Sequence, residues 1–411
     1  MIKKVPLEEL QPGMHIERFD CGWLNHPFIF NSKRVKSQGE IERLRSWGVT
    51  HVYIEISHPP NPAPAGLGPK IPPLPVEAEF EHIVTPQTAR VDRELRHIPI
   101  RHELVRAEKV RQRASQAAKN ILAAVQAGKK IRTREAETAV GELDNSICHN
   151  KDALFLLMRL RKKDAYTFDH SVSVGVLLLG FCRAMGFDQE TTRTIGLGGL
   201  LHDVGKMAVP LAILNKPGAL NDAEFKKIQQ HVIHCREILA TSHNIPGPAA
   251  QIAMEHHERF DGTGYPHGLA ADAISLGGQM ASIADVFDAL TSDRCYRNGL
   301  DQVEVLRKLY GWSRSHFNEG LVHRFIRCIG VYPAGTLVQL ESGLLGVVVE
   351  STDNLLRPVV RLIYDTKHGW AVSQKDIDLS KPNGKGGGDR IISYESAKRW
   401  RINPLKVLGL T

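Results

Sequence analysis

Two short strings between residues 202 and 266 concentrate side chains of the kind that bind metal ions. The first, HDVGK, runs from His202 to Lys206, and the second, HHERFDGTGYP, runs from His256 to Pro266. Adjacent His-Asp and His-His pairs inside otherwise apolar sequence are costly to bury unless a cation or a charge partner offsets their desolvation. The pattern therefore predicts a metal site to which both strings contribute.

Single His and Asp residues before, between and after these strings enlarge the candidate set. Seven residues lie in stretches that predict helices or helix ends: His170, His202, Asp203, His231, His256, His257 and Asp285. Imidazole and carboxylate ligands without thiolate suit Fe, Mn, Co, Ni or Zn and argue against Ca or Mg alone. One ion takes three or four ligands, so seven candidates predict two ions that share a bridging carboxylate. Such a pair is a recurrent device for phosphoester hydrolysis, because it lowers the pKa of a bridging water.

Length and composition limit the other possibilities. The 411 residues predict two or three domains. A net charge of +8 favours a phosphate-bearing ligand, but it forms no long Lys/Arg run, so we expect no nucleic-acid polymer as a partner. The six cysteines form no CxxC pair, and the longest apolar run, Val174 to Cys182, is too short to cross a bilayer. These features predict a cytoplasmic protein without a membrane span.

The first 149 residues contain none of the candidate ligands. Residues 1–58 predict a small α+β domain, and the proline-rich segment 59–100 predicts a linker. Residues 101–149 predict two connecting helices, over about 101–128 and 132–147. These helices either pack on the next domain or dimerise, so a homodimer stays open.

The ligand candidates all fall in a helix-rich segment, 150–332. Within it, Asn221 followed by Glu224 predicts a capping box at a helix start. Residues 333–411 contain short β-type runs and predict a small β unit with a basic tail. The expected fold is mainly α, with a small α+β unit at the N-terminus and a small β unit at the C-terminus.

The joint motif resembles the HD phosphohydrolase superfamily and, within it, the HD-GYP subgroup. His202 and Asp203, with His170 before them and Asp285 after them, are similar to the HD pattern, and 264–266 is similar to the GYP element. The resemblance implies an all-helical HD-type core that hydrolyses the bacterial second messenger cyclic di-GMP to pGpG and GMP through a metal-activated hydroxide.

This resemblance covers about residues 150 to 335. Residues 1–57 also resemble the small domain that often precedes HD-GYP domains.

The resemblance also implies roles for single residues. One ion would be held by His170, His202, Asp203 and Asp285, with Asp203 as the bridge, and the second would be completed by His231, His256 and His257. Lys206 is expected to contact phosphate or to help protonate the leaving oxygen, and Arg294 and Arg297 are expected to bind the ligand phosphates. Two divalent ions, iron or manganese, are the expected cofactors.

The GYP loop is expected to be architectural. Gly262 and Gly264 permit unusual backbone angles, Tyr265 completes the motif, and Pro266 fixes the exit from the loop. In the family this loop also contacts GGDEF-type proteins, which are therefore candidate partners. Asp288, one turn after Asp285, is expected to orient a histidine.

Two positions depart from the family pattern. Some members bind a third ion through a Glu one turn before the first histidine, but that position is Tyr166 here, so two ions are expected. Cys235 stands where glycine is common, and its larger side chain could crowd a neighbouring helix.

Two alternative functions use the same residues. The first is an HD hydrolase of another cyclic dinucleotide, because the sequence does not determine base specificity. The second is a non-catalytic regulatory module that binds cyclic di-GMP or a protein. The full ligand set and Lys206 favour an enzyme over the second alternative.

Overall fold

The computed structural model of the chain divides into two compact units. One comprises Met1–Ile71 and Val209–Gln230, and the other comprises Pro72–Ala208 and His231–Thr411. The structure describes residues 2–19, 33–35, 38, 41–42, 51–55, 80, 83, 98–160, 166–214, 216, 220–242, 244–292, 299–313, 315–382, 387–397 and 399–410. The predicted linker lies almost entirely outside these ranges.

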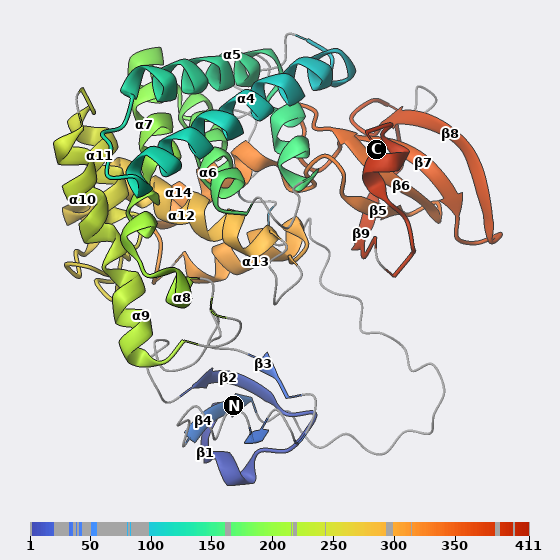
Figure 1. Cartoon of the computed structure of the whole chain (residues 1–411). Helices are drawn as coiled ribbons and strands as arrows, with labels where there is room; N and C mark the ends of the chain where they lie inside the picture. Colours follow the sequence, from blue (N-terminus) through green and yellow to red (C-terminus); the bar gives the residue numbers. More distant parts are fainter. Residues whose placement is uncertain are drawn as a thin grey trace. The chain divides into compact units, whose positions relative to one another are not determined.

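The N-terminal sheet has four strands in the order β1-β4-β2-β3 (Figure 1). Their bounds are Ile2–Pro6 for β1, His15–Phe19 for β2, Lys33–Arg34 for β3 and His51–Glu55 for β4. Alternating apolar side chains build its core, among them Val5, Ile16, Val52 and Ile54. Only alternate residues of a strand face this core, because successive side chains point to opposite faces of a sheet.

Two short helices belong to the same unit, α8 (Leu211–Leu214) and α9 (Asp222–Gln229). The predicted capping box is confirmed. The Asn221 side chain accepts from the Glu224 N–H, and the Glu224 carboxylate accepts from the Asn221 N–H.

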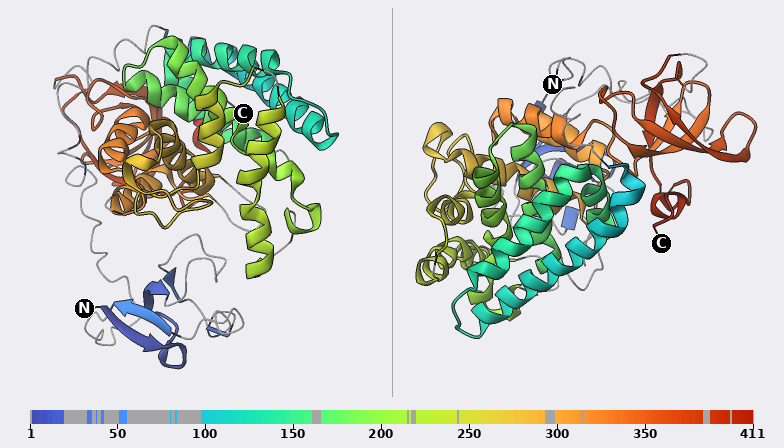
Figure 2. Two further views of the ribbon diagram at one scale, coloured as in Figure 1. Left: turned by 90° about the vertical axis from the view of Figure 1, so that its left-hand side faces the viewer. Right: turned by 90° about the horizontal axis from the view of Figure 1, so that it is seen from above.

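Two long helices, α4 (Ile100–Gln126) and α5 (Thr133–Leu157), precede the ligand-bearing segment. Gly128 adopts φ +68 directly after α4, so the predicted helix end is confirmed. The two helices lie side by side, and the apolar face of α4 packs on α5 and α6 (Figure 2). This contact favours the packed alternative for the connecting helices.

Helix α5 continues ten residues beyond the predicted end because the chain restarts a helix after a break. At Asn150 the backbone is non-helical, with φ −166 and ψ 104. The Asn150 side chain bonds two backbone groups at this break. Its Nδ2 donates to Ile98 O, and its Oδ1 accepts from the Asp152 N–H, which the break leaves without a helical acceptor.

The remaining helices form the core that positions the candidate ligands. They are α6 (Tyr166–Ala184), α7 (Gln189–Leu201), α10 (His231–Thr241), α11 (Gly247–Glu255), α12 (Leu276–Thr291), α13 (Gln302–Trp312) and α14 (Glu319–Ile329), with the 3-10 turns η5 (Val204–Ala208) and η6 (Ala271–Ala273). A buried carboxylate, Asp144 on α5, binds both Arg183 on α6 and Arg193 on α7. The connecting helices are thereby joined to the core by charge as well as by apolar packing.

A five-stranded antiparallel sheet follows, in the order β8-β7-β6-β5-β9. Its strands are β5 (Leu337–Leu340), β6 (Leu344–Glu350), β7 (Val359–Asp365), β8 (Trp370–Asp378) and β9 (Ile391–Glu395). The first three coincide with the predicted β-type runs. The segment predicted as a basic tail contains α15 (Pro404–Val407), and it packs Trp400 and Leu408 against the sheet.

This sheet is tied to the helical core by polar contacts. The Asp152 carboxylate accepts from the Ser351 N–H at 3.0 Å and from the Ser351 hydroxyl at 2.6 Å. The Arg159 guanidinium donates to Ala334 O at 2.9 Å.

The prediction of a mainly helical fold with a small sheet at each end is confirmed. Among the described residues, no helix combines the length and the apolar character needed to cross a bilayer.

Candidate metal centre

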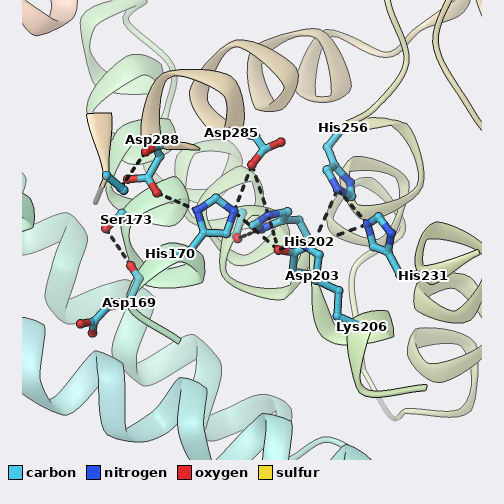
Figure 3. A network of polar contacts seen from close by, with 12 residues as sticks. Asp169, His170, Ser173, His202, Asp203, Lys206, His231, His256, Asp285 and Asp288 are labelled. Carbon is cyan, nitrogen blue, oxygen red and sulfur yellow. Dashed lines mark hydrogen bonds and ion pairs between the residues drawn. The ribbon is translucent and has the colours of Figure 1, made fainter. Parts of the chain in front are cut away.

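The seven candidate ligands come from five segments of the core and converge on one region. All of them except His257 are labelled in Figure 3. His170 lies on α6, His202 and Asp203 directly after α7, His231 at the start of α10, His256 and His257 directly after α11, and Asp285 on α12. Five of the seven lie at a helix start or directly after a helix end, and the other two, His170 and Asp285, lie within helices.

The ligand atoms fall into overlapping groups, each within 4.8 Å. One group is His170, His202 and Asp285, and another is His231, His256 and His257. A third group, His202, Asp203 and His256, joins the other two. This division matches the allocation to two ions that the resemblance implies.

Asp203 lies between the two groups and directs one oxygen to each. Its Oδ2 is 3.5 Å from His170 Nε2 and 3.3 Å from His202 Nε2. Its Oδ1 is 3.5 Å from His231 Nε2 and 3.9 Å from His256 Nε2. A carboxylate in this position would be available to a cation held by either group.

Two atoms of the centre are buried without a hydrogen-bond partner in the described part of the chain. They are His202 Nε2 and Asp203 Oδ1. A buried acceptor without a partner is unfavourable, and nearly all such atoms in folded proteins are satisfied. The donor set therefore fits divalent cations, and binding of a cation would give each of these two atoms a partner.

The outer nitrogens of three histidines are held by neighbouring acceptors. His202 Nδ1 donates to Gly199 O at 2.7 Å, and His256 Nδ1 donates to Ala253 O at 3.0 Å. His170 Nδ1 lies 2.6 Å from a carboxylate oxygen of Asp288, the residue expected to orient a histidine. These contacts leave Nε2 of each ring facing the other ligands, as metal-binding histidines require.

The electrostatics of the centre keep three of its ligands in the protonation states that bind a cation. Burial lowers the pKa of His256 well below its usual range and that of His257 to about 3, so both rings are neutral and keep a lone pair for a cation. Burial alone would raise the pKa of Asp203, but the charges of His202 and Lys206 hold it well below its usual value.

The pKa of His170, in contrast, shows electronegative surroundings around this ring. Burial lowers it, but the carboxylates of Asp285 and Asp288 outweigh burial and raise it to about 9. Burial would raise the pKa of Asp285 itself, and its contact with His170 keeps it well below the usual range. The two carboxylates therefore stabilise a positive charge beside this ring.

Lys206 lies at the side of the centre. Its Nζ is 2.5 Å from Asp203 Oδ2, and about a quarter of its side chain is exposed, at 24%. The predicted phosphate-binding residues Arg294 and Arg297 lie outside the described residues, as does the side chain of Tyr166.

The GYP loop packs directly on a candidate ligand. The Tyr265 ring stacks on His257 with centroids 4.7 Å apart, and the Tyr265 N–H donates to His257 O at 3.2 Å. Gly262 has φ +78, whereas Gly264 has no space for a side chain, because a Cβ there would lie 2.4 Å from Arg259 N. Pro266 follows a cis peptide bond. The loop therefore supports His257 through backbone geometry and ring stacking.

Glu258 is a structural residue of this loop that the sequence interpretation missed. Its carboxylate is 1% exposed and accepts from the backbone N–H groups of His267 at 2.8 Å and Leu269 at 3.0 Å. Its position directly after the two histidines was the only signal in the sequence. The carboxylate closes the loop that holds Tyr265 on His257.

Replacing Glu258 by Gln is expected to destabilise the fold by about 1.5–3 kcal/mol, because one of two charge-assisted hydrogen bonds is lost in a buried place. Activity should fall along with stability, since the Tyr265 ring loses its support. Denaturant unfolding measures the first effect and initial rates the second. The exposed Glu237→Gln is the matched control, and equal stability of the two variants would contradict the role assigned to Glu258.

Gly205 is a second residue whose role was missed. A Cβ at this position would lie 1.9 Å from His231 O and 2.6 Å from Cys235 N. The Gly205 N–H donates to Cys235 Sγ at 3.1 Å, and that thiol contacts His202 O at 3.0 Å. Cys235 thus links the two segments and does not force them apart. Its own pKa is raised to about 12 by burial, so it remains a thiol.

We expect Gly205→Ala to destabilise the protein by about 3 kcal/mol or more, because the added methyl group collides with backbone and cannot be relieved by a rotamer change. The same displacement should separate Asp203 from His231 and lower the metal content. Thermal unfolding and elemental analysis measure these effects. Gly247→Ala is the control, since a Cβ there meets nothing within 4 Å. Wild-type values for Gly205→Ala would refute the close contact.

Comparison with protein families assigns most of the chain. Residues 2–136 match a family described as a domain of unknown function, DUF3391. Residues 152–321 match the HD domain family, and this range contains all seven candidate ligands.

Individual relatives extend these matches. A cyclic di-GMP phosphodiesterase of Pseudomonas aeruginosa is 36% identical over 98% of this chain and 95% of its own length. A 3′3′-cGAMP-specific phosphodiesterase of Vibrio cholerae is 40% identical over 35% of this chain and 33% of its own length.

Among solved structures, an HDGYP-type protein from Bdellovibrio bacteriovorus aligns with a TM-score of 0.47 and 18% identity. The alignment covers 79% of this chain and 98% of that protein. The near full-length relative from Pseudomonas aeruginosa and the HD domain match lead to one assignment. This chain belongs to the HD-GYP family of cyclic di-GMP phosphodiesterases.

Proposed function

We propose that this chain hydrolyses cyclic di-GMP at a centre of two divalent ions and releases pGpG and GMP. The observation that carries the proposal is the position of Asp203, whose two oxygens face two separate groups of histidines. The near full-length relative named a cyclic di-GMP phosphodiesterase supports the choice of substrate.

Each ion would have its own set of ligands. His170, His202 and Asp285 would hold one ion, His231, His256 and His257 would hold the other, and Asp203 would contact both. Bound there, divalent ions lower the pKa of water and neutralise phosphate oxygens. Iron and manganese both suit this mixture of imidazole and carboxylate.

Lys206 would act on the substrate beside the ions. Its ammonium group is held by Asp203 and is partly exposed, so it can donate to a phosphate oxygen or to the leaving oxygen. Asp203 would then have two tasks, since it would orient Lys206 as well as bind the ions.

A second cyclic dinucleotide is the alternative substrate. The Vibrio cholerae relative that is 40% identical over 35% of this chain is named as specific for 3′3′-cGAMP. The two substrates differ in one base and share the phosphodiester linkages, so the metal centre alone does not discriminate between them.

Parallel hydrolysis assays separate these substrates. The full chain, purified with manganese or iron, is incubated with cyclic di-GMP or 3′3′-cGAMP, and the products are resolved by chromatography. We expect faster loss of cyclic di-GMP, with pGpG and then GMP appearing, and no loss with Asp203→Ala. Faster loss of 3′3′-cGAMP would assign the alternative substrate, and equal rates for wild type and Asp203→Ala would refute hydrolysis at this centre.

A further inference from the structure

The residue next to a candidate ligand is tied to a distant helix. Asp169 precedes His170 on α6 and is buried, with 7% exposure. Its side chain is directed away from His202 and Asp203, whereas the His170 ring faces them (Figure 3). Asp169 and His170 thus point in different directions from α6, His170 toward the other candidate ligands and Asp169 away from them.

The partners of Asp169 lie on α4. Asp169 Oδ1 accepts from the Ser115 hydroxyl at 2.8 Å and forms an ion pair with Arg111 Nη1 at 3.8 Å. The Arg111 guanidinium is itself oriented by Glu108, which accepts from its Nε and Nη2 at 2.9 Å each. A guanidinium held on one edge by a carboxylate keeps its charge in a fixed place beside Asp169.

This support acts on the first turn of α6, where the helix is least constrained from within. The first four N–H groups of a helix have no intrahelical acceptor, so the direction of the first turn depends on its side-chain contacts. Asp169 belongs to this turn, and its carbonyl also accepts from Ser173 Oγ at 2.7 Å. His170 follows directly, so a shift of Asp169 moves the ligand.

Helix α4 also packs on η5, the turn that begins directly after Asp203. One helix therefore contacts both the segment that carries His170 and the segment that follows Asp203. These residues are two of the four that surround the first ion position.

We infer that Ser115 and Arg111 are positioning residues for the metal centre, because they fix Asp169 and so aim His170 Nε2 at Asp285 and Asp203. Both lie within residues 2–136, the segment matched by a domain of unknown function, and outside the HD match. The inference rests on the proposed metal centre. It gives this part of the N-terminal family segment a role in positioning a metal ligand.

The test uses the full chain and titration with Mn²⁺. We expect Ser115→Ala to bind one Mn²⁺ about tenfold to a hundredfold more weakly, the range found for residues that orient metal ligands. The kcat should fall while KM for cyclic di-GMP stays unchanged, because Ser115 does not touch the substrate. Ser115→Thr keeps the hydroxyl and should restore Mn²⁺ binding. Gln116→Ala, on the exposed face of the same helix, is the control.

A double-mutant cycle tests the route through Asp169. If Ser115 acts through that carboxylate, Ser115→Ala should add nothing to the loss in Asp169→Ala. Wild-type Mn²⁺ affinity in Ser115→Ala, or losses that add in the double variant, would overturn the inference. The titration measures binding without turnover, so failure of the inference differs from failure of the proposed function, in which wild type itself leaves cyclic di-GMP intact.

Discussion

Asp203→Asn is expected to lower kcat by at least about a thousandfold, which corresponds to about 4 kcal/mol of transition-state stabilisation. Both carboxylate oxygens face imidazole nitrogens, and Oδ2 also holds the Lys206 ammonium group. The amide removes the negative charge and presents an N–H group to one set of ligands. Metal content and kcat should therefore fall together.

The control for this change is Asp272→Asn, an exposed carboxylate on η6. It should retain wild-type metal content and rate. Steady-state assays measure kcat and elemental analysis measures the metal content of both variants. If Asp203→Asn keeps more than about a tenth of wild-type kcat, a loss of under about 1.4 kcal/mol, Asp203 is not the bridge.

Lys206→Met is expected to lower kcat by about 10²–10³-fold while the metal content remains that of wild type. Methionine keeps much of the apolar stem and removes the ammonium group that lies 2.5 Å from Asp203 Oδ2. The substrate then loses a donor to its phosphate or leaving oxygen, whereas the histidines are unchanged.

The separation of rate from metal content is the informative part of this prediction. Lys119→Met, exposed on α4, controls for loss of a surface charge. Loss of bound metal in Lys206→Met would assign Lys206 to the structure of the centre, and an unchanged kcat would remove it from catalysis.

The candidate ligands could be predicted because their chemistry is local in the sequence. The polar pairs at 202–203 and 256–257 are unusual in the apolar sequence around them. Because buried polar and charged groups need a partner, this contrast predicts that they bind something. The spacing of apolar residues also predicts α4 and the first three strands of the C-terminal sheet. Strand β8 was missed because WAVSQKDID is exposed along most of its length and has no apolar alternation.

The supporting contacts could not be predicted, because they join residues that are distant in the sequence or depend on backbone distances. Ser115 and Asp169 are separated by 54 positions, and neither is unusual in its own segment. The requirement for glycine at Gly205 follows from the approach of His231 O, which no local pattern encodes. The break of α5 at Asn150 is likewise accompanied by a hydrogen bond to Ile98 O, a residue 52 positions away.

The number of metal ions per chain tests the central claim most directly. Elemental analysis of the full chain, purified with manganese or iron and active on cyclic di-GMP, should find two ions. His170→Ala and His256→Ala should each retain about one ion, because each variant lacks one protein ligand of one ion and keeps the ligands of the other. One ion or three ions in the active wild-type protein would contradict a centre of two ions bridged by Asp203.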